Sequence, residues 1–311
     1  GRQIRSGSVH AEGGRRDPRT GIRERRFLLE GATSDMIVPA AQECLAQRGL
    51  TPEDIDCVIV CTVTPDNMFP STAATVQRKM GLTNAWGFDL SAACSGFLYG
   101  LTTGAALIES KSVRRVLVCG SDKMSSIINP DDRSTYILFG DGAGVVLLEH
   151  SEDKSIGIKD SILKMDGRGG DYLYMTAGGS AKPPTHETVA NKEHYAVQDG
   201  QTVFKSAVVG MADVSEEIMK KNNLTADDIA WLVPHQANLR IIDATARRMG
   251  LSPDKVMINI DRYGNTTAGT IPICLSELWH QGKLKYGDGV ILASFGAGYT
   301  WGSIYLRWGM K

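Results

Sequence analysis

One cysteine, one histidine and one asparagine stand at turn-like positions where side chains could do chemistry. Cys94 lies in FDLSAACSGF, residues 88–97, after an apolar run and before a helical one. His235 lies in LVPHQANLRI, where the preceding proline ends a predicted strand. Asn265 lies in RYGNTTAG, directly after a glycine. Each residue alone is more typical of a structural role, as a small core cysteine, a capping histidine or a turn asparagine.

Together the three side chains suit the chemistry of thioesters. A helix start favours a thiolate, so we expect a lowered pKa for Cys94 and attack on a thioester that stores its acyl group. His235 and Asn265 offer two N–H donors for the enolate that forms when a malonyl thioester loses CO2. Asparagine is no base, which favours decarboxylation over direct proton abstraction. In the turn SFGAGYT, the backbone N–H of Ala297 is predicted to form an oxyanion hole with that of Cys94.

An internal repeat predicts how these residues meet. LTPEDIDCVIVCT, residues 50–62, reappears as LTADDIAWLVPHQ, residues 224–236. In both halves a short strand, a turn of small residues, a helix and two further strands follow. Strands that alternate with helices indicate mostly parallel sheets covered on both faces. A pseudo-twofold axis between the halves would bring Cys94, His235 and Asn265 to the same edge of paired sheets.

The repeat also predicts the domain organisation. An atypical Arg/Gly-rich leader covers residues 1–26, shows almost no apolar periodicity, and is expected to be disordered or truncated. The half with the cysteine covers 27–150, and the half with the histidine and asparagine covers 151–311. In the second half, VMINI, residues 256–260, is predicted to be a strand. A polar insertion over 166–205 has no counterpart in the first half, and such insertions are usually lids or binding loops.

Composition narrows the possible partners. A formal net charge of −1 favours neither nucleic acid nor a membrane surface, and no apolar run approaches the roughly eighteen residues of a membrane span. The six cysteines form no CxxC pair and lie mostly in apolar runs, which indicates free thiols in a reducing compartment such as the cytoplasm. Cys57 and Cys61 share one strand face, but no cluster of histidines or cysteines joins them, so no metal site is predicted.

Six motifs resemble those of β-ketoacyl-acyl-carrier-protein synthase III, a family of the thiolase superfamily. In order along the chain they are RTGIRERR (19–26), DLSAACSGF (89–97), DDRSTYILFGDGAG (131–144), WLVPHQANLRI (231–241), YGNTTAG (263–269) and SFGAGYTWGS (294–303). The resemblance implies an α/β fold of the thiolase-like type, with five αβαβα layers and two pseudo-duplicated halves. It also implies a cytoplasmic homodimer.

The resemblance further implies a reaction. An acyl-CoA primer, for which acetyl-CoA is expected, would condense with malonyl-acyl-carrier protein to give 3-oxoacyl-carrier protein, CoA and CO2. This step starts type II fatty-acid synthesis and uses no cofactor beyond the CoA thioester, which is a substrate. In the family pattern Cys94 matches the acylated nucleophile, and His235 and Asn265 match the decarboxylation donors.

Four more positions match the family. Arg19 and Arg133 match residues that contact the nucleotide end of CoA, and Arg240 matches a residue that docks the acidic carrier protein. Guanidinium groups suit phosphate, although each arginine fits a surface ion pair equally well. Phe69 matches a residue that reaches the acyl pocket of the partner subunit; by itself it reads as a loop aromatic.

The N-terminus departs from the family pattern. Family members open with a Gly-containing strand and an acidic helix whose Trp precedes RTGI. GRQIRSGSVHAEGGRRDP, residues 1–18, contains neither. The difference predicts that the first sheet lacks a central strand and that CoA lacks the Trp that stacks on its adenine.

Four other functions compete with this hypothesis. A thiolase would carry a second catalytic cysteine near residues 294–300, where none is present. A polyketide-type starter synthase is not distinguished, because the sequence does not give the volume of the primer pocket. A Cys–His–Asn hydrolase would lack the duplicated halves and would release a free acid. A non-catalytic homologue is disfavoured because all three active-site residues are retained.

Overall fold

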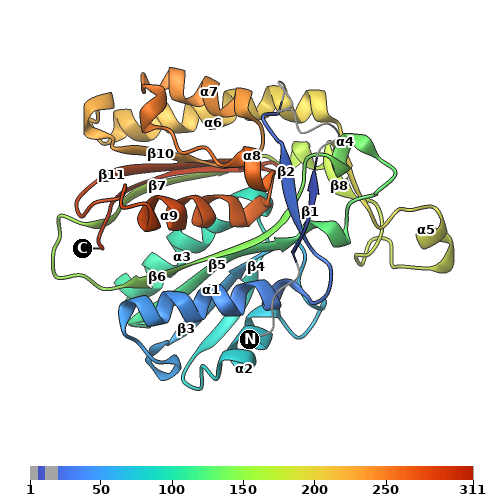
Figure 1. The fold of residues 1–311 in the computed structure, drawn as a ribbon, viewed down its shortest axis with the longest axis horizontal. Helices are drawn as coiled ribbons and strands as arrows, with labels where there is room; N and C mark the ends of the chain where they lie inside the picture. Colours follow the sequence, from blue (N-terminus) through green and yellow to red (C-terminus); the bar gives the residue numbers. More distant parts are fainter. Residues whose placement is uncertain (1–5, 11–19, 311) are drawn as a thin grey trace.

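The computed structural model describes residues 6–10, by their backbone, and residues 20–310, and these form five layers (Figure 1). Helices α1 and α2 form one outer layer, α6 and α7 form the other, and α3 and α9 lie between the two sheets. Their bounds are Thr33–Arg48 (α1), Thr72–Met80 (α2), Gly96–Glu109 (α3), Gly200–Lys221 (α6), Leu239–Arg248 (α7) and Thr270–His280 (α9). The predicted five-layered α/β fold is confirmed.

The first sheet has the strand order β4-β3-β5-β6. Its strands are Cys57–Cys61 (β3), Trp86–Leu90 (β4), Arg115–Lys123 (β5) and Asp141–Glu149 (β6). β3 runs parallel to β4 and β5, and β6 runs antiparallel to β5. Every residue of β3 is buried, because helices cover both faces of the sheet, and this explains why CVIVC is apolar throughout.

The second sheet has the order β10-β11-β12-β7. Its strands are Gly157–Met165 (β7), Trp231–Pro234 (β10), Gly289–Gly296 (β11) and Thr300–Arg307 (β12). The strand predicted over residues 256–260 is wrong: a single bridge joins Val256 to Leu232, and helix α8 (Ile260–Tyr263) follows. The side-chain carbonyl of Gln236 accepts the backbone N–H groups of Asn259 and Ile260 there, where a strand would need a neighbouring strand.

The two sheets differ at both edges. At one edge β4 pairs with β3, whereas β10 has only the bridge between Leu232 and Val256 on that side, in the part of the chain that the structure describes. By the sequence repeat β3 corresponds to β10, and their neighbours β5 and β11 correspond in the same way. β12 then corresponds to β6, but β12 has β7 on its outer side, whereas among the described residues no strand pairs with the outer edge of β6. The prediction that the first sheet lacks a central strand is therefore wrong, because β3 and β5 pair directly. The strand that has no counterpart in the first sheet is β7, which lies at the edge of the second sheet.

The leader contains regular structure that the sequence did not predict. Ser6–His10 (β1) pairs antiparallel with Glu24–Leu28 (β2), and the backbone N–H of Leu28 donates to Asp141 at 2.8 Å. The expected disorder of the leader is wrong for these strands, and β2 crosses the boundary predicted after residue 26. Residues 1–5 and 11–19 lie outside the described residues, and the predicted domain boundaries stay a prediction.

The insertion forms a separate arm that projects from the layers on the right of Figure 1. It contains Gly167–Asp171 (η4), Leu173–Met175 (β8), His186–Ala190 (α5) and Ala196–Gln198 (β9), and β8 pairs antiparallel with β9. It ends earlier than residue 205, because the Asp199 side chain caps the N-terminus of α6. The remaining short elements are Pro52–Asp54 (η1), Ala93–Ser95 (η2), Met124–Ser126 (η3), Arg133–Tyr136 (α4), Ala226–Asp228 (η5), Pro253–Lys255 (η6) and Thr267–Gly269 (η7).

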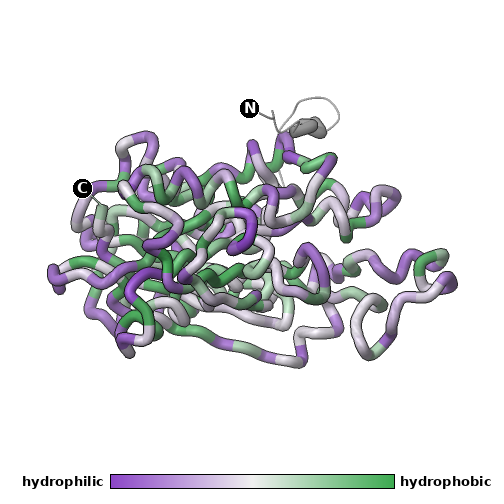
Figure 2. Tube along the Cα trace, turned by 90° about the horizontal axis from the view of Figure 1, so that it is seen from below, coloured by the Kyte–Doolittle hydropathy of each residue, from purple (hydrophilic) through white to green (hydrophobic). Residues whose placement is uncertain are grey.

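The core lies between the sheets. Phe97 and Leu101 of α3 and Leu275 and Leu278 of α9 are buried in one cluster with side chains from both sheets. Figure 2 shows hydrophobic segments through the middle of the molecule and mostly hydrophilic outer loops. Within residues 6–10 and 20–310, no helix has the length and hydropathy to cross a membrane.

Candidate active site

Cys94 lies in the short η2 turn directly before α3. Its side chain is buried, with 6% exposed, and the preceding Ala93 has a φ of +48°, which non-glycine residues seldom adopt. Gly296, at the end of β11, lies against the cysteine backbone, and a Cβ at this position would be 2.8 Å from the Cys94 nitrogen. Ser294 donates its hydroxyl to the Cys94 carbonyl at 2.8 Å. The backbone of Cys94 is therefore held by the second half of the molecule.

His235 follows β10 and is 2% exposed. Its backbone N–H donates to Ala293 of β11 at 2.8 Å, and its Nδ1 lies 2.7 Å from Oγ1 of Thr270. Burial lowers the pKa of His235 from 6.5 to about 3, so the imidazole is neutral at physiological pH. Its Nε2 is buried and has no hydrogen-bond partner within the described part of the chain.

Asn265 is buried in the loop between α8 and η7. Its backbone N–H donates to Leu138, and its carbonyl accepts from Gly140. Its Oδ1 accepts the backbone N–H of Thr267 at 2.9 Å, which identifies Nδ2 as the donor end of the amide. Gly264, with a φ of +64°, is required before it, because a Cβ there would lie 2.8 Å from the Leu138 carbonyl oxygen.

Shared contacts link the three residues. Cys94 and His235 are held by adjacent residues of β11, Ser294 and Ala293. His235 and Asn265 are linked on the other side, since the Thr270 hydroxyl oxygen lies 2.7 Å from Nδ1 of His235 and 3.1 Å from the carbonyl oxygen of Thr267, whose N–H binds Asn265. η2 and η7, each at the start of a central helix, pack against each other. The structure thus brings these residues together, and their catalytic roles stay a prediction.

The expected lowering of the Cys94 pKa is wrong. Burial, and secondly the negative charge of Asp122, raise the pKa of Cys94 to about 12. The helix start favours a thiolate, but the loss of hydration in this buried position outweighs it. The cysteine is therefore a neutral thiol at rest.

The glycine-rich turn after β11 lies beside the η2 turn that contains Cys94. Oγ1 of Thr300 is 2.8 Å from the Ala92 carbonyl and 3.1 Å from that of Ala297. The insertion reaches the same place, because the Tyr172 ring stacks on that of Tyr299, with centroids 6.3 Å apart. The turn that contains Ala297 therefore lies next to η2. The oxyanion role of the Ala297 N–H stays a prediction.

The other predicted site residues lie on the surface or outside the described residues. Arg19 falls outside them. Arg133 begins α4 and is exposed. Arg240 of α7 is exposed, with its guanidinium 4.8 Å from the centre of the Phe204 ring. Phe69 is 86% exposed. Their proposed roles in binding CoA, the carrier protein and the primer stay predictions.

Sequence reasoning missed the polar residues that support the site. Asp122, Thr267 and Thr270 are buried and join the three candidate residues to the framework. One signal was available for Asp122, which is charged yet directly follows the buried run VLVCGS. The two threonines carried no signal, since threonines are common in turns and at helix starts.

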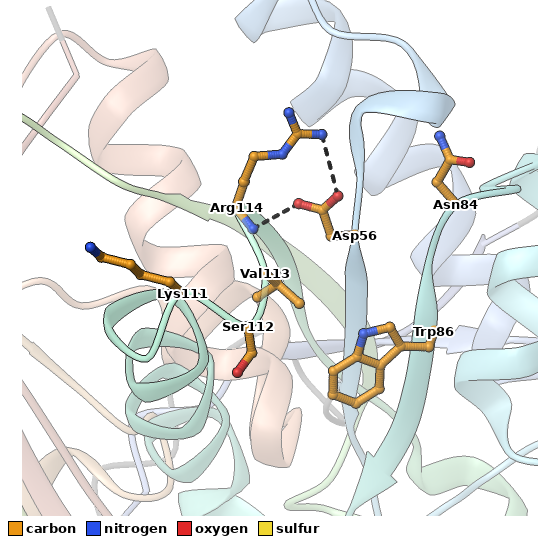
Figure 3. A pocket seen from close by; sticks show the side chains of 7 residues that line it. All are labelled: Asp56, Asn84, Trp86, Lys111, Ser112, Val113 and Arg114. Carbon is orange, nitrogen blue, oxygen red and sulfur yellow. Dashed lines mark hydrogen bonds and ion pairs between the residues drawn. The ribbon is translucent and has the colours of Figure 1, made fainter.

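A surface pocket elsewhere is unrelated to this chemistry. Figure 3 shows Arg114 turned toward Asp56, with Trp86 on the opposite wall. The pocket is lined by Asp56, Asn84, Trp86, Lys111, Ser112, Val113 and Arg114. These residues lie at the amino ends of β3, β4 and β5, whereas Cys94 follows the carboxyl end of β4.

The buried neutral histidine predicts a dependence of stability on pH. Between pH 6.5 and about 3 the unfolded chain binds a proton at His235 that the folded chain does not, so stability is complete above 6.5 and falls as the pH falls. Between pH 7 and 4.5 we expect the wild type to lose about 3 kcal/mol more than His235→Gln. Urea unfolding of both proteins at the two pH values measures this difference. An identical loss in both would contradict a neutral buried imidazole.

Comparison with known proteins gives a consistent result. A family model described as 3-oxoacyl-(acyl-carrier-protein) synthase III matches residues 88–167, and the model of its C-terminal part matches residues 219–308. The β-ketoacyl-(acyl-carrier-protein) synthase III of Chlorobaculum tepidum is 58% identical over 293 residues, which are 93% of this chain and 89% of that protein. The protein of the same name from Koribacter versatilis is 54% identical over 292 residues, 93% of this chain and 88% of that protein.

Solved structures agree with the sequence matches. The 3-oxoacyl-(acyl-carrier-protein) synthase III of Aquifex aeolicus has a TM-score of 0.86 and 39% identity, and the match covers 93% of this chain and 89% of that one. The priming β-ketosynthase of the R1128 polyketide pathway has a TM-score of 0.85 and 34% identity, and the match covers 94% and 86%.

Proposed function

Because the chain belongs to the 3-oxoacyl-(acyl-carrier-protein) synthase III family, we propose that Cys94, His235 and Asn265 perform its condensation. The protein is an acyltransferase that condenses an acyl-CoA primer with malonyl-acyl-carrier protein and so initiates fatty-acid synthesis. The products are 3-oxoacyl-carrier protein, CoA and CO2. The division of this reaction among the three residues is our proposal.

In the first step Cys94 takes the acyl group. Its sulfur forms a bond to the thioester carbon, the bond from that carbon to the CoA sulfur breaks, and the thiol proton leaves with CoA. The N–H groups of Cys94 and Ala297 stabilise the oxyanion of the tetrahedral intermediate. The close fit of Gly296 on the Cys94 backbone supports this, because any larger residue would cover that N–H.

In the second step malonyl-carrier protein loses CO2. The bond to the carboxylate breaks, and its electrons pass to the thioester oxygen as an enolate. The enolate carbon then attacks the acyl carbon on Cys94, the bond from that carbon to the Cys94 sulfur breaks, and the thiolate that leaves takes up a proton from water. Nε2 of His235 and Nδ2 of Asn265 donate to the enolate oxygen. This role requires the proton on Nε2, so Nδ1 accepts the Thr270 hydroxyl at 2.7 Å, the shorter of that hydroxyl's two contacts; the other is to the Thr267 carbonyl at 3.1 Å.

One observation carries the assignment of the donors. Nε2 of a neutral, buried His235 has no partner among the described residues, and a buried polar group without a partner costs about 1–3 kcal/mol. Proteins seldom leave such a group unpaired, so we infer that a substrate oxygen completes it. The Nδ2 end of the Asn265 amide, held in the same network, supplies the second donor.

A coupled assay tests the function. The protein is incubated with acetyl-CoA and malonyl-carrier protein, and CO2, CoA and acyl-carrier products are measured together. We expect one CO2 and one CoA for each 3-oxoacyl product. CoA release without a longer acyl product would indicate a hydrolase instead.

Acetyl-CoA is our proposed primer, and a polyketide-type starter is the second candidate. The 34% identical priming ketosynthase supports the second, but the relatives at 54–58% identity carry the fatty-acid synthase name. A panel of straight and branched acyl-CoA primers separates the two. Preference for acetyl-CoA is the expected result.

Basic residues supply the proposed binding contacts. We assign Arg19 and Arg133 to the phosphates of CoA and Arg240 to the acidic carrier protein. The exposed position of Arg240 on α7, five residues after His235, supports docking near the site. The six free cysteines support a reducing compartment, and we place the reaction in the cytoplasm.

We also propose a homodimer in which Phe69 enters the partner's acyl pocket. Phe69 and the neighbouring Met68 are large apolar side chains that are 86% and 79% exposed, which is unusual unless another surface covers them. Light scattering should give twice the 33.6 kDa mass of the chain. Phe69→Ala should raise the KM for the primer about tenfold, the typical effect of truncating a buried interface aromatic. A fully active monomer would contradict this arrangement.

A further inference from the structure

Asp122 is a fully buried carboxylate at the carboxyl end of β5. Its Oδ1 accepts four hydrogen bonds from the segment after β3: from the hydroxyl of Thr62 at 2.9 Å, the N–H of Val63 at 2.7 Å, and the N–H and hydroxyl of Thr64 at 3.2 and 3.1 Å. All four contacts lie in the first half of the molecule.

Its other oxygen binds the second half. Oδ2 accepts a hydrogen bond from the Thr267 hydroxyl and another from the Ala268 N–H at 3.3 Å. Burial raises the pKa of Asp122, and the hydrogen bonds oppose that shift. All six of these contacts are made by donors, which suits a carboxylate bound as an anion. Asp122 therefore joins the two halves at the start of η7, directly beside the candidate active site.

The residue it holds is in an unusual conformation. Thr267 has a φ of +49°, which is rare for a β-branched side chain and persists only where contacts enforce it. The Thr267 N–H orients the amide of Asn265, and its carbonyl oxygen lies 3.1 Å from the hydroxyl of Thr270, which contacts His235. A shift of Thr267 would thus move both proposed decarboxylation donors.

The internal repeat explains why a carboxylate stands here. Val116 opposite Cys57 and Val290 opposite Trp231 are equivalent pairs, so six residues further on Asp122 is equivalent to Gly296. Gly296 leaves the helix start at Cys94 uncovered, whereas Asp122 occupies the helix start at Ala268. One helix start is open for a substrate and the other is closed by an internal anion.

We propose that Asp122 is a positioning residue for decarboxylation, which holds Asn265 and His235 in place through Thr267 and Thr270. The inference rests on the proposed function, because it assigns these two residues to the decarboxylation step. Asp122 does not touch substrate. It fixes the backbone that aims the two donors.

The test separates the two half-reactions in Asp122→Asn. Acylation by acetyl-CoA is followed by intact mass, and CO2 release is followed after the acyl-enzyme meets malonyl-carrier protein. We expect CO2 release to fall about 100-fold, as for other displacements of catalytic groups by about 1 Å, and acylation to stay within about threefold. Equal losses in both steps would overturn the proposal.

A pH profile supplies a readout that a merely structural role would not move. The Asp122 carboxylate raises the pKa of Cys94, so its removal should shift the pH profile of acylation to lower pH. An unshifted profile together with a general loss of activity would mean that Asp122 only supports the fold.

Matched variants control for stability. Asp141→Asn makes the same change at another buried carboxylate of the same sheet, whose donors, Leu28 and Ser125, are all in the first half. Asp141→Asn should affect acylation and CO2 release by similar factors. A selective loss of CO2 release in Asp141→Asn would overturn the proposal.

A second pair keeps the test valid if Asp122→Asn does not fold. Thr267→Val removes the hydroxyl that binds Asp122 and should reproduce the selective loss of CO2 release, whereas Thr267→Ser should restore it. No difference between the valine and serine variants would overturn the proposal. Absence of CO2 release by the wild type would instead refute the proposed function.

Discussion

Replacement of Cys94 by alanine should abolish the acyl-enzyme and slow condensation at least about a thousandfold, as expected when a nucleophile is removed. The acyl group has no other acceptor in the proposed sequence. Intact mass after incubation with acetyl-CoA should show one added acetyl group in the wild type and none in the variant. Condensation is measured as CoA and CO2 released together with malonyl-carrier protein.

Cys119 provides the matched control. It is fully buried in β5, and burial raises the pKa of its thiol well above the ordinary value. Cys119→Ala removes another buried thiol of the first half and should leave the acylation stoichiometry unchanged. Acetylation that persists in Cys94→Ala would show that another residue is the nucleophile, and the proposed mechanism would fail.

Replacement of either donor should separate the two half-reactions. His235→Ala and Asn265→Ala should each lower CO2 release about 100- to 1000-fold, which is the usual cost of one oxyanion donor, while Cys94 is still acylated. The two donors act on one enolate oxygen, so the double variant should lose less than the product of the single losses. Rapid quenching followed by intact mass gives acylation, and trapped CO2 gives decarboxylation.

Asn259→Ala is the control for Asn265. Asn259 is also a buried asparagine, but its side chain contacts Glu277 and Cys274 in the framework. Its loss should reduce stability and affect both half-reactions by similar factors. If His235→Ala or Asn265→Ala impaired acylation as much as decarboxylation, their roles as enolate donors would be wrong.

Local patterns predicted much of the fold. The apolar runs CVIVC and VLVC form central strands buried on both faces. The repeat also identified β3 and β10 as equivalent strands, since each runs parallel to the corresponding neighbour, β5 or β11. The same repeat misjudged residues 256–260, because the amide of Gln236 satisfies that backbone in place of a strand, and side-chain hydrogen bonds do not show in hydrophobic periodicity.

The site was predictable in its principal residues but not in its support. Cys94, His235 and Asn265 stand in distinctive motifs, whereas the role of Asp122 depends on a contact with a residue 145 positions away. The direction of the Cys94 pKa was also missed. A helix start is visible in sequence, but the depth at which the sulfur is buried depends on packing by both halves.

One helix start faces Gly296 and the other binds Asp122, and this difference limits what either half could do if it were present twice. Two copies of the first half would present two sulfurs and no imidazole, and two copies of the second would present enolate donors with no acyl acceptor. The two halves therefore supply different parts of the proposed reaction, and neither half could replace the other.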